Sequence, residues 1–254
     1  MQRDQPDGVP PLALTGERTL PDVPEENYWY RRHLVVYEWI AKRVAGARVI
    51  DMASGEGYGS AVLARTAASV IGVEANPEAF EHARARYGAP ARPNVRFERA
   101  LVEEFAAPAD AVVFLQTIEH LQQPGETLDH FASLLEGSGT VFLSTPNVLT
   151  LAPKGAERSD NPWHIHEYRP DEFEELCRAH FSEVEMYGLF HARKLRVHEL
   201  ALRAGWDRVH AALGITRRFY DRFTPAISVS DFALRPAARA DMSRALDLIA
   251  VCRP

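Results

Sequence analysis

The 254-residue sequence predicts an α/β fold with a doubly wound, largely parallel sheet. Short apolar runs alternate with segments of helical spacing, and most of these runs are apolar throughout, as in strands covered on both faces. Right-handed crossover connections then place helices on both sides of the sheet. A small-residue turn at 53–59 joins the first run to the first crossover helix, as in a ligand-binding sheet.

The elements follow in order along the chain. Residues 25–44 carry Trp29 and His33 on one apolar stripe, which predicts an amphipathic helix lying across the body of the protein. Pro77 suits the first turn of another helix, with Asn76 as its N-cap. Strands are expected at 48–53, 69–74, 94–97, 110–115, 140–144, 182–190 and 246–251, and further helices at 58–66, 77–87, 124–135 and 171–180.

Three parts of the chain differ in composition. Residues 1–24 are rich in Pro, Gly and Asp, which predicts a flexible N-terminal segment. Residues 25–190 together with 228–254 are expected to form the sheet domain. Residues 191–227 have helical stretches at 194–203 and 207–213 but no clear place in the sheet, so they are expected to form a helical lid on the substrate side.

Composition narrows the class of protein. Hydrophobic residues make up 46% and charged residues 25%, which is typical of a soluble globular protein, and the net charge of −6 argues against a nucleic-acid partner. Cys177 and Cys252 stand far apart, which excludes a disulfide framework and a thiolate zinc site. Neither a signal peptide nor a membrane-spanning run is recognisable, so the expected location is the cytoplasm.

A nucleotide site is predicted at the end of the first strand. Asp51 ends an apolar strand, and a turn containing Gly55 and Gly57 leads directly into a helix. Glu74 ends the second strand nineteen residues after Gly55, where a carboxylate can accept hydrogen bonds from both ribose hydroxyls. A glycine cluster alone indicates only a tight turn, but this combination predicts a nucleoside-containing cofactor.

The spacing of the glycines distinguishes between cofactors. Dinucleotide sites use G-x-G-x-x-G, whereas here Gly55, Gly57 and Gly59 alternate after Asp51, whose carboxylate suits a cationic sulfonium better than a pyrophosphate. The segment 50–59, Ile-Asp-Met-Ala-Ser-Gly-Glu-Gly-Tyr-Gly, resembles the first motif of the class I S-adenosylmethionine-dependent methyltransferases. Ala53 departs from that motif, because it stands where the family usually has its first glycine.

The resemblance continues through segments 73–77, 100–103, 114–121 and 144–147. It implies a Rossmann-like sheet of seven strands with the last strand antiparallel. It also implies a set of residues that hold S-adenosylmethionine: Asp51, Ala53, Ser54, Gly55, Tyr58, Glu74, Ala75, Ala100, Leu101, Gln116 and Thr117.

Histidines are the candidate catalytic groups, because a hydroxyl acceptor needs a base near neutral pH. His120 follows the fourth strand, and His164 and His166 lie after the fifth, where their alternation predicts a shared face in an extended stretch. Each could equally hydrogen-bond a loop carbonyl. Glu119, His120 and His166 are weak candidates for a divalent metal site. Small-RNA 2′-O-methyltransferases place two Glu and two His in this region, but Gln116 replaces the first Glu here.

The substrate side combines aromatic and basic residues. Trp163, Tyr168, His191 and Arg193 are the predicted substrate contacts. The stretch 191–222 is basic and could attract an anionic acceptor, although a solvated helical face explains the same charges. The basic residues are Arg193, Lys194, Arg196, Arg203, Arg208, Arg217, Arg218 and Arg222.

A narrower resemblance concerns the acceptor. Segments 15–21, 26–33, 188–191 and 230–232 resemble an actinobacterial methyltransferase subfamily linked to methylglucose lipopolysaccharide assembly. It implies O-methylation of a glucose or glucoside hydroxyl, on a small-molecule or oligosaccharide acceptor such as glucosylglycerate or a glucan. Three alternatives stay open: a methyltransferase of phenols or polyketides, a nicotinamide oxidoreductase, and a cofactor-binding protein without catalysis.

Overall fold

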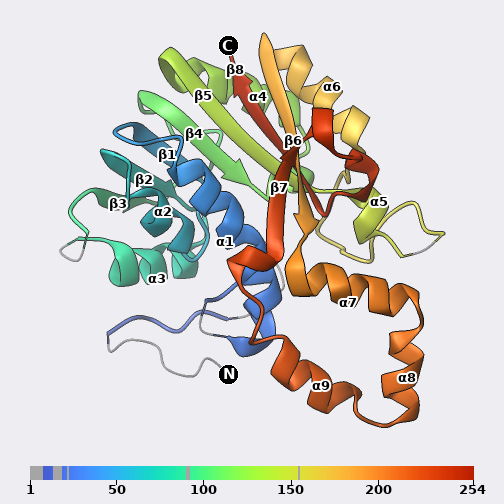
Figure 1. Cartoon of the computed structure of the whole chain (residues 1–254). Helices are drawn as coiled ribbons and strands as arrows, with labels where there is room; N and C mark the ends of the chain where they lie inside the picture. The colour runs from blue at the N-terminus through green and yellow to red at the C-terminus, as the bar shows by residue number, and fades with distance from the viewer. Residues whose placement is uncertain (1–7, 14–18, 22, 90–91, 154) are drawn as a thin grey trace.

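The computed structural model describes residues 8–13, 19–21, 23–89, 92–153 and 155–254. Its centre is an eight-stranded sheet with the order β3-β2-β1-β4-β5-β8-β6-β7 (Figure 1). The strands are β1 (Arg48–Met52), β2 (Ser69–Val73), β3 (Val95–Glu98), β4 (Ala109–Leu115), β5 (Leu135–Pro146), β6 (Glu183–His191), β7 (Phe232–Pro236) and β8 (Asp247–Arg253).

Strand directions confirm the predicted doubly wound sheet. Strands β1 to β5 pair in parallel, and the last strand, β8, runs antiparallel between β5 and β6. The sheet has eight strands rather than the seven expected, because β7 adds an antiparallel edge beside β6. This short strand pairs on one side only and ends at Pro236, and these features hide an edge strand from pattern analysis.

Helices cover both faces of the sheet. Side chains alternate between the faces along the buried strands, so that Val49 packs under α1 and α2 whereas Ile50 packs under α4 and α6. The helices are α1 (Asn27–Ala41), α2 (Tyr58–Leu63), α3 (Pro77–Tyr87), α4 (Pro124–Leu134), α5 (Val148–Leu151), α6 (Pro170–His180), α7 (Arg193–Arg203), α8 (Trp206–Ala212) and α9 (Thr216–Phe223).

Helix α1 is tied to the end of the sheet by a buried ion pair. Arg32 donates from Nε and Nη2 to the two carboxylate oxygens of Asp247, at 2.8 and 2.6 Å, and from Nη2 to the carbonyl of Leu246 at 2.8 Å. Removal of one partner would leave a buried charge uncompensated, so this pair fixes the position of α1 over the sheet. Helix α1 is thereby held beside the carboxyl ends of the parallel strands.

The predicted insertion is helical. Helix α7 leads away from the sheet, α8 follows it, and α9 runs back toward the start of α1 (Figure 1). Helix α9 was not among the helical stretches expected in this segment, although its residues are amphipathic. In the predicted N-terminal segment, Leu12, Leu20 and Val23 are buried in a small cluster with Ala79, while residues 1–7, 14–18 and 22 lie outside the described residues. No helix in the described part of the chain is long and apolar enough to cross a membrane.

Candidate active site

The turn after β1 forms one wall of a narrow cleft, here called the cofactor cleft. Ala53, Gly55 and Gly57 have φ values of +54°, +56° and +94°, so the backbone turns sharply before α2 begins at Tyr58. If Gly55 carried a Cβ, no neighbouring atom would lie within 4 Å of it, whereas a Cβ on Gly59 would lie 2.2 Å from the ring of Tyr37. Gly55 therefore leaves room for a ligand, and Gly59 leaves room for α1.

Two buried carboxylates hold this turn. Glu74 accepts hydrogen bonds from the backbone N–H groups of Gly55 and Asn76, at 2.8 and 2.9 Å. Asp51 is fully buried and accepts hydrogen bonds from the hydroxyls of Tyr37 and Ser60, at 3.2 and 2.7 Å. Burial raises the pKa of Asp51 to about 7, although the two hydrogen bonds oppose the shift. A positively charged ligand nearby would favour the ionised form of Asp51.

A second cavity, here called the reaction pocket, adjoins the cofactor cleft. It has a volume of about 320 Å³, and Thr19, His33 and Gln116 line both spaces. Helix α1, the short 3₁₀ helix η2 (Ile118–His120), the end of β5 and the loop after α5 form its walls. Because these walls meet at the carboxyl ends of the parallel strands, the pocket lies where open α/β sheets bind ligands.

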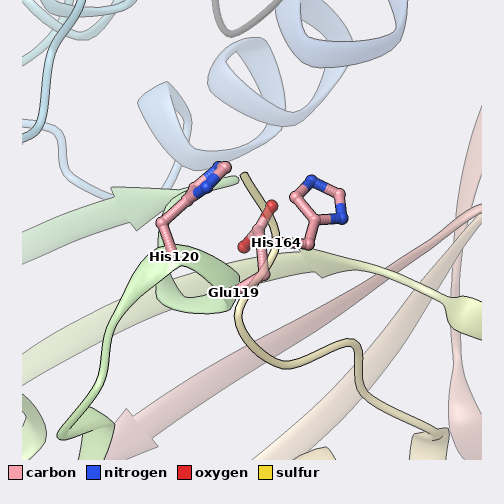
Figure 2. Close-up of side chains that lie close together, drawn as sticks. All are labelled: Glu119, His120 and His164. Carbon is pink, nitrogen blue, oxygen red and sulfur yellow. The ribbon is translucent and has the colours of Figure 1, made fainter. Parts of the chain in front are cut away.

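Glu119, His120 and His164 converge in the reaction pocket. Figure 2 shows the carboxylate of Glu119 between the two imidazole rings. The ring centroids of His120 and His164 lie 5.1 Å apart. One potential ligand atom from each of the three residues lies within 4.8 Å of the others. This geometry suits either proton transfer or coordination of a divalent cation.

Hydrogen bonds orient both histidines. Nδ1 of His164 lies 2.6 Å from the carboxylate of Glu167, and its Nε2 lies 2.9 Å from the amide nitrogen of Asn161. Nδ1 of His120 lies 2.9 Å from the carbonyl oxygen of Trp163. In each neutral ring the proton therefore resides on Nδ1 and the lone pair on Nε2. Nε2 is thus the basic nitrogen of both rings, but in His164 it already accepts the N–H of Asn161, which a proton or a cation would displace.

Glu119 is unusual because it is only 1% exposed. Burial raises its pKa to about 8, even though the Thr145 hydroxyl donates a hydrogen bond to the carboxylate at 3.2 Å. The Glu119 carbonyl also accepts the backbone N–H groups of Ile165 and His166, which fastens the loop onto η2. In the absence of a bound cation, this carboxyl group is mostly protonated at neutral pH.

Comparison with known proteins identifies the family. Residues 28–200 match a model described as a methyltransferase domain. The chain is 37% identical to a probable S-adenosylmethionine-dependent methyltransferase of Mycolicibacterium smegmatis, over 97% of each chain. It belongs to the S-adenosylmethionine-dependent methyltransferases.

Two further similarities cover less of the sequence or share less identity. A ubiquinone biosynthesis O-methyltransferase of Albidiferax ferrireducens is 32% identical, over 65% of this chain and 70% of that protein. A solved methyltransferase from Thermotoga maritima has a TM-score of 0.59 at 14% identity, covering 90% of this chain and 94% of that one, which shows a shared fold. The predicted enzyme class and the cofactor S-adenosylmethionine are thus confirmed.

The cofactor cleft has a volume of about 90 Å³, so it can hold only part of a molecule of S-adenosylmethionine. The Ser54 hydroxyl oxygen is buried and has no hydrogen-bond partner among the described residues, so it is available to a polar group of a ligand. Six of the predicted residues line the cleft: Ala53, Ser54, Gly55, Tyr58, Gln116 and Thr117. Asp51 and Glu74 do not line the cleft, but each accepts a hydrogen bond from a residue that does, Tyr37 and Gly55 respectively.

The remaining predicted cofactor residues belong to the ends of neighbouring strands. Ala75 follows β2, and Ala100 and Leu101 follow β3. Leu101 is 50% exposed, which is unusual for a large apolar side chain and suits contact with the flat face of a nucleobase. These three residues do not line the cofactor cleft itself.

The predicted acceptor-side residues are scattered. His120 and His164 meet in the reaction pocket, but His166 is exposed, with its ring 4.4 Å from that of Tyr168. The shared face expected for His164 and His166 is wrong, because the chain bends at Ile165, between the two histidines, instead of running extended. The structure accordingly groups His164, not His166, with Glu119 and His120.

The four predicted substrate contacts also separate. Tyr168 is buried in the main core, where it packs against Phe173, and does not line the reaction pocket. Trp163 is 57% exposed and contributes its carbonyl to His120. His191 lines a different cavity, and Arg193 is an exposed residue at the start of α7.

Sequence reasoning missed several residues of the reaction pocket. His33 was assigned to the apolar stripe of α1, yet it lines both the reaction pocket and the cofactor cleft. Burial lowers the pKa of His33 to about 4, so its ring is neutral at pH 7. Asn161 and Glu167 orient His164, and their position next to it in the loop was the available signal.

Proposed function

We propose that this methyltransferase transfers the methyl group to a hydroxyl oxygen of a sugar or glucoside. The observation that carries the proposal is the oriented Glu119–His120–His164 cluster in a pocket that adjoins the cofactor cleft. An alcohol oxygen is a poor nucleophile until a base removes its proton, and the cluster offers such bases. A nitrogen or thiolate acceptor would have less need of this arrangement.

The chain supplies a base and a binding site for the reacting groups. S-adenosylmethionine provides an electrophilic methyl carbon on a positively charged sulfur. As the acceptor oxygen bonds to that carbon, the carbon–sulfur bond breaks and its electron pair stays on sulfur. Nε2 of His164 takes the hydroxyl proton as the acceptor displaces the Asn161 amide from it, and the Glu167 carboxylate stabilises the resulting imidazolium through Nδ1–H. Alignment of the two reacting atoms supplies much of the remaining rate.

His120 has a second role in this proposal. Its Nδ1–H donates to the Trp163 carbonyl, which directs Nε2 as a hydrogen-bond acceptor. A hydroxyl between His120 and His164 would therefore have two acceptors for its proton. His166 is a weaker candidate, because it is exposed and lies against Tyr168.

A divalent cation is a second candidate for the same cluster. One carboxylate oxygen and two imidazole nitrogens form a set of nitrogen and oxygen ligands, which a hydroxyl-activating metal prefers. A cation would also favour ionisation of the buried Glu119. Methyl transfer assayed with a strong chelator and then with added Mg²⁺, Mn²⁺ or Zn²⁺ separates the two mechanisms. Turnover that persists in the presence of the chelator would exclude a catalytic metal.

Two observations favour a sugar acceptor: the size of the reaction pocket and the narrower family resemblance. A cavity of about 320 Å³ lies at the small end of the range for ligand pockets and suits one sugar ring or one aromatic ring. Trp29 is 40% exposed at its wall and offers an apolar face for a ring. The similarity to a ubiquinone biosynthesis O-methyltransferase favours a phenolic acceptor as the alternative.

The test is methyl transfer from S-adenosylmethionine to a panel of acceptors, with products identified by mass spectrometry. The panel contains glucose, methyl glucosides, glucosylglycerate and short α-glucans, together with catechols and polyprenyl phenols. An O-methylated saccharide would support the proposal. Methylation of phenols alone would replace the sugar with the alternative acceptor, and exclusive N- or S-methylation would overturn O-methyl transfer.

A further inference from the structure

A large cavity lined by arginines lies on the other side of α5 from the reaction pocket. This arginine pocket has a volume of about 630 Å³ and is formed by α5, α7, the ends of β6 and β7, and the two short helices before β8. Its cationic side chains are Arg196, Arg203, Arg235, Arg239 and Arg244. Only the first two belong to the basic stretch 191–222 identified in the sequence.

Most of this positive charge has no carboxylate partner. Glu199 is already shared by Arg203 and His191, and Asp241 accepts hydrogen bonds from Ser243. Within the described part of the chain, the other four arginines form no salt bridge: Arg196, Arg235, Arg239 and Arg244. The hydrogen bonds from Ser243 and, to a smaller extent, the charge of Arg244 lower the pKa of Asp241, so Arg244 is partly balanced. Positive charge still exceeds negative charge in the cavity, which five arginines and two carboxylates line.

The chemistry of the lining favours an oxyanion. A guanidinium group presents parallel N–H donors that match the oxygen atoms of a carboxylate or a phosphate. The guanidinium of Arg235 lies 5.5 Å from the ring centroid of Phe190, over the aromatic face, which limits its orientation. The other basic residues of the stretch 191–222 do not line the cavity, and two of them, Lys194 and Arg217, pair with Asp231 and Asp221.

The arginine pocket and the reaction pocket share a thin wall. Helix α5 lines both, with Leu149 and Thr150 facing the arginine pocket and Leu151 facing the reaction pocket. Arg32, which lines the reaction pocket, donates to the carbonyl of Leu246, which lines the arginine pocket, at 2.8 Å. An extended acceptor lying across α5 can therefore reach both cavities.

We infer that the arginine pocket binds the anionic group of the acceptor, a carboxylate or a phosphate, while the reacting hydroxyl lies beside His120 and His164. Only the placement of the reacting hydroxyl rests on the proposed O-methyl transfer. Binding of an anion by the arginine pocket stands independently of the reaction. The acceptor class thereby narrows to acidic saccharides, such as sugar acids, glycosides of hydroxy acids and sugar phosphates.

The first test measures binding of inorganic phosphate and of glycerate by calorimetry at low ionic strength, where exposed charges are least screened. The variant Arg239→Gln/Arg244→Gln removes two of the unpaired charges and keeps polar side chains. Arg217→Gln/Arg218→Gln removes the same charge from α9, outside the pocket, and serves as the matched control. We expect the first variant to bind at least about tenfold more weakly and the control to bind as the wild type does. The more tightly bound of the two anions identifies the preferred group.

The second test measures turnover with acceptors that differ only in an anionic group, such as glucosylglycerate against glucosylglycerol. We expect the acidic partner to have the lower KM, and Arg239→Gln/Arg244→Gln to raise that KM at least about tenfold while kcat and S-adenosylhomocysteine affinity stay unchanged. Equal KM values for both acceptors, or anion binding unaffected by the variant, would overturn the inference. Anion binding that depends on the arginines, together with no O-methylation of any acceptor, would uphold the pocket and refute the proposed function.

Discussion

The cofactor cleft and the reaction pocket are built in opposite ways. Five of the eleven residues that line the cleft come from one short segment, residues 53–58, which Glu74 supports from the next strand. The reaction pocket instead combines side chains from α1, η2, β5 and a loop, which are far apart in the sequence. A local motif can therefore specify cofactor binding, whereas acceptor chemistry depends on how distant segments pack together.

The largest expected loss of activity comes from a substitution in the reaction pocket. His164→Ala removes the proposed base, and we expect kcat to fall by about 100-fold or more. The affinity for S-adenosylhomocysteine should stay within about twofold, because His164 does not line the cofactor cleft. His166→Ala is the control, since that side chain is exposed. An equal loss of kcat in both variants, or a loss of cofactor affinity in His164→Ala, would contradict the separation of the reaction pocket from the cofactor cleft.

The converse prediction is that a substitution at the cofactor cleft weakens cofactor binding. Glu74→Ala leaves the N–H groups of Gly55 and Asn76 without their acceptor, so the turn loses its support. We expect calorimetry to show S-adenosylhomocysteine binding weakened about tenfold or more, with a native circular dichroism spectrum. Glu78→Ala, in the exposed first turn of α3, should bind as the wild type does. Unchanged affinity in Glu74→Ala would mean that the cofactor binds elsewhere.

A smaller effect tests how His164 is oriented. Glu167→Gln keeps the size of the side chain but removes the negative charge beside Nδ1. We expect kcat to fall by about tenfold with KM nearly unchanged, because the imidazolium formed in the reaction loses its negatively charged partner. An increase in KM with an unchanged kcat would assign Glu167 to loop structure only.

The last prediction concerns stability. The pKa of Glu119 is raised by burial from its usual 4.5 to about 8, so the folded state binds this proton more tightly than the unfolded state. The free energy of unfolding should therefore decrease as the pH rises from about 4.5 to 8, by at most about 1.4 kcal/mol per pH unit from this group. Glu119→Gln should lack this component in urea unfolding with a chelator present.

The same urea-unfolding experiment also tests whether Glu119 binds a divalent cation. Identical pH dependence in the wild type and Glu119→Gln would contradict the buried, protonated carboxyl group. A slope that disappears when a divalent cation replaces the chelator would indicate an ionised Glu119 bound to that cation. The stability measurement thereby distinguishes the two roles of the cluster without an acceptor.

Much of the fold follows from local pattern, because apolar runs and crossover helices recur with regular spacing. The strand ends at Asp51 and Glu74 and the turn at Gly55 were predictable for the same reason. The acceptor side was harder to predict. His33 has the spacing of a core residue, and the loop turn that separates His164 from His166 is set by contacts with Glu119 rather than by sequence period. Edge strand β7 lacks the pattern of a buried strand.

The arginine pocket illustrates the same limit. The basic stretch 191–222 predicted an anionic contact, but only Arg196 and Arg203 from that stretch line the cavity. Arg235, Arg239 and Arg244 come from a separate segment and join them only through pairing of β6 with β7. Charge counts along a chain therefore indicate the presence of a basic surface better than its location.

The most direct test of the central claim is a crystal structure of the protein with S-adenosylhomocysteine. We expect the ribose hydroxyls beside Glu74 and the adenine near Leu101. We also expect the sulfur atom to face the reaction pocket at Gln116, on the side of the Glu119–His120–His164 cluster. A sulfur atom directed away from that cluster, or a ligand outside the cofactor cleft, would contradict the assignment of the reaction to this pocket.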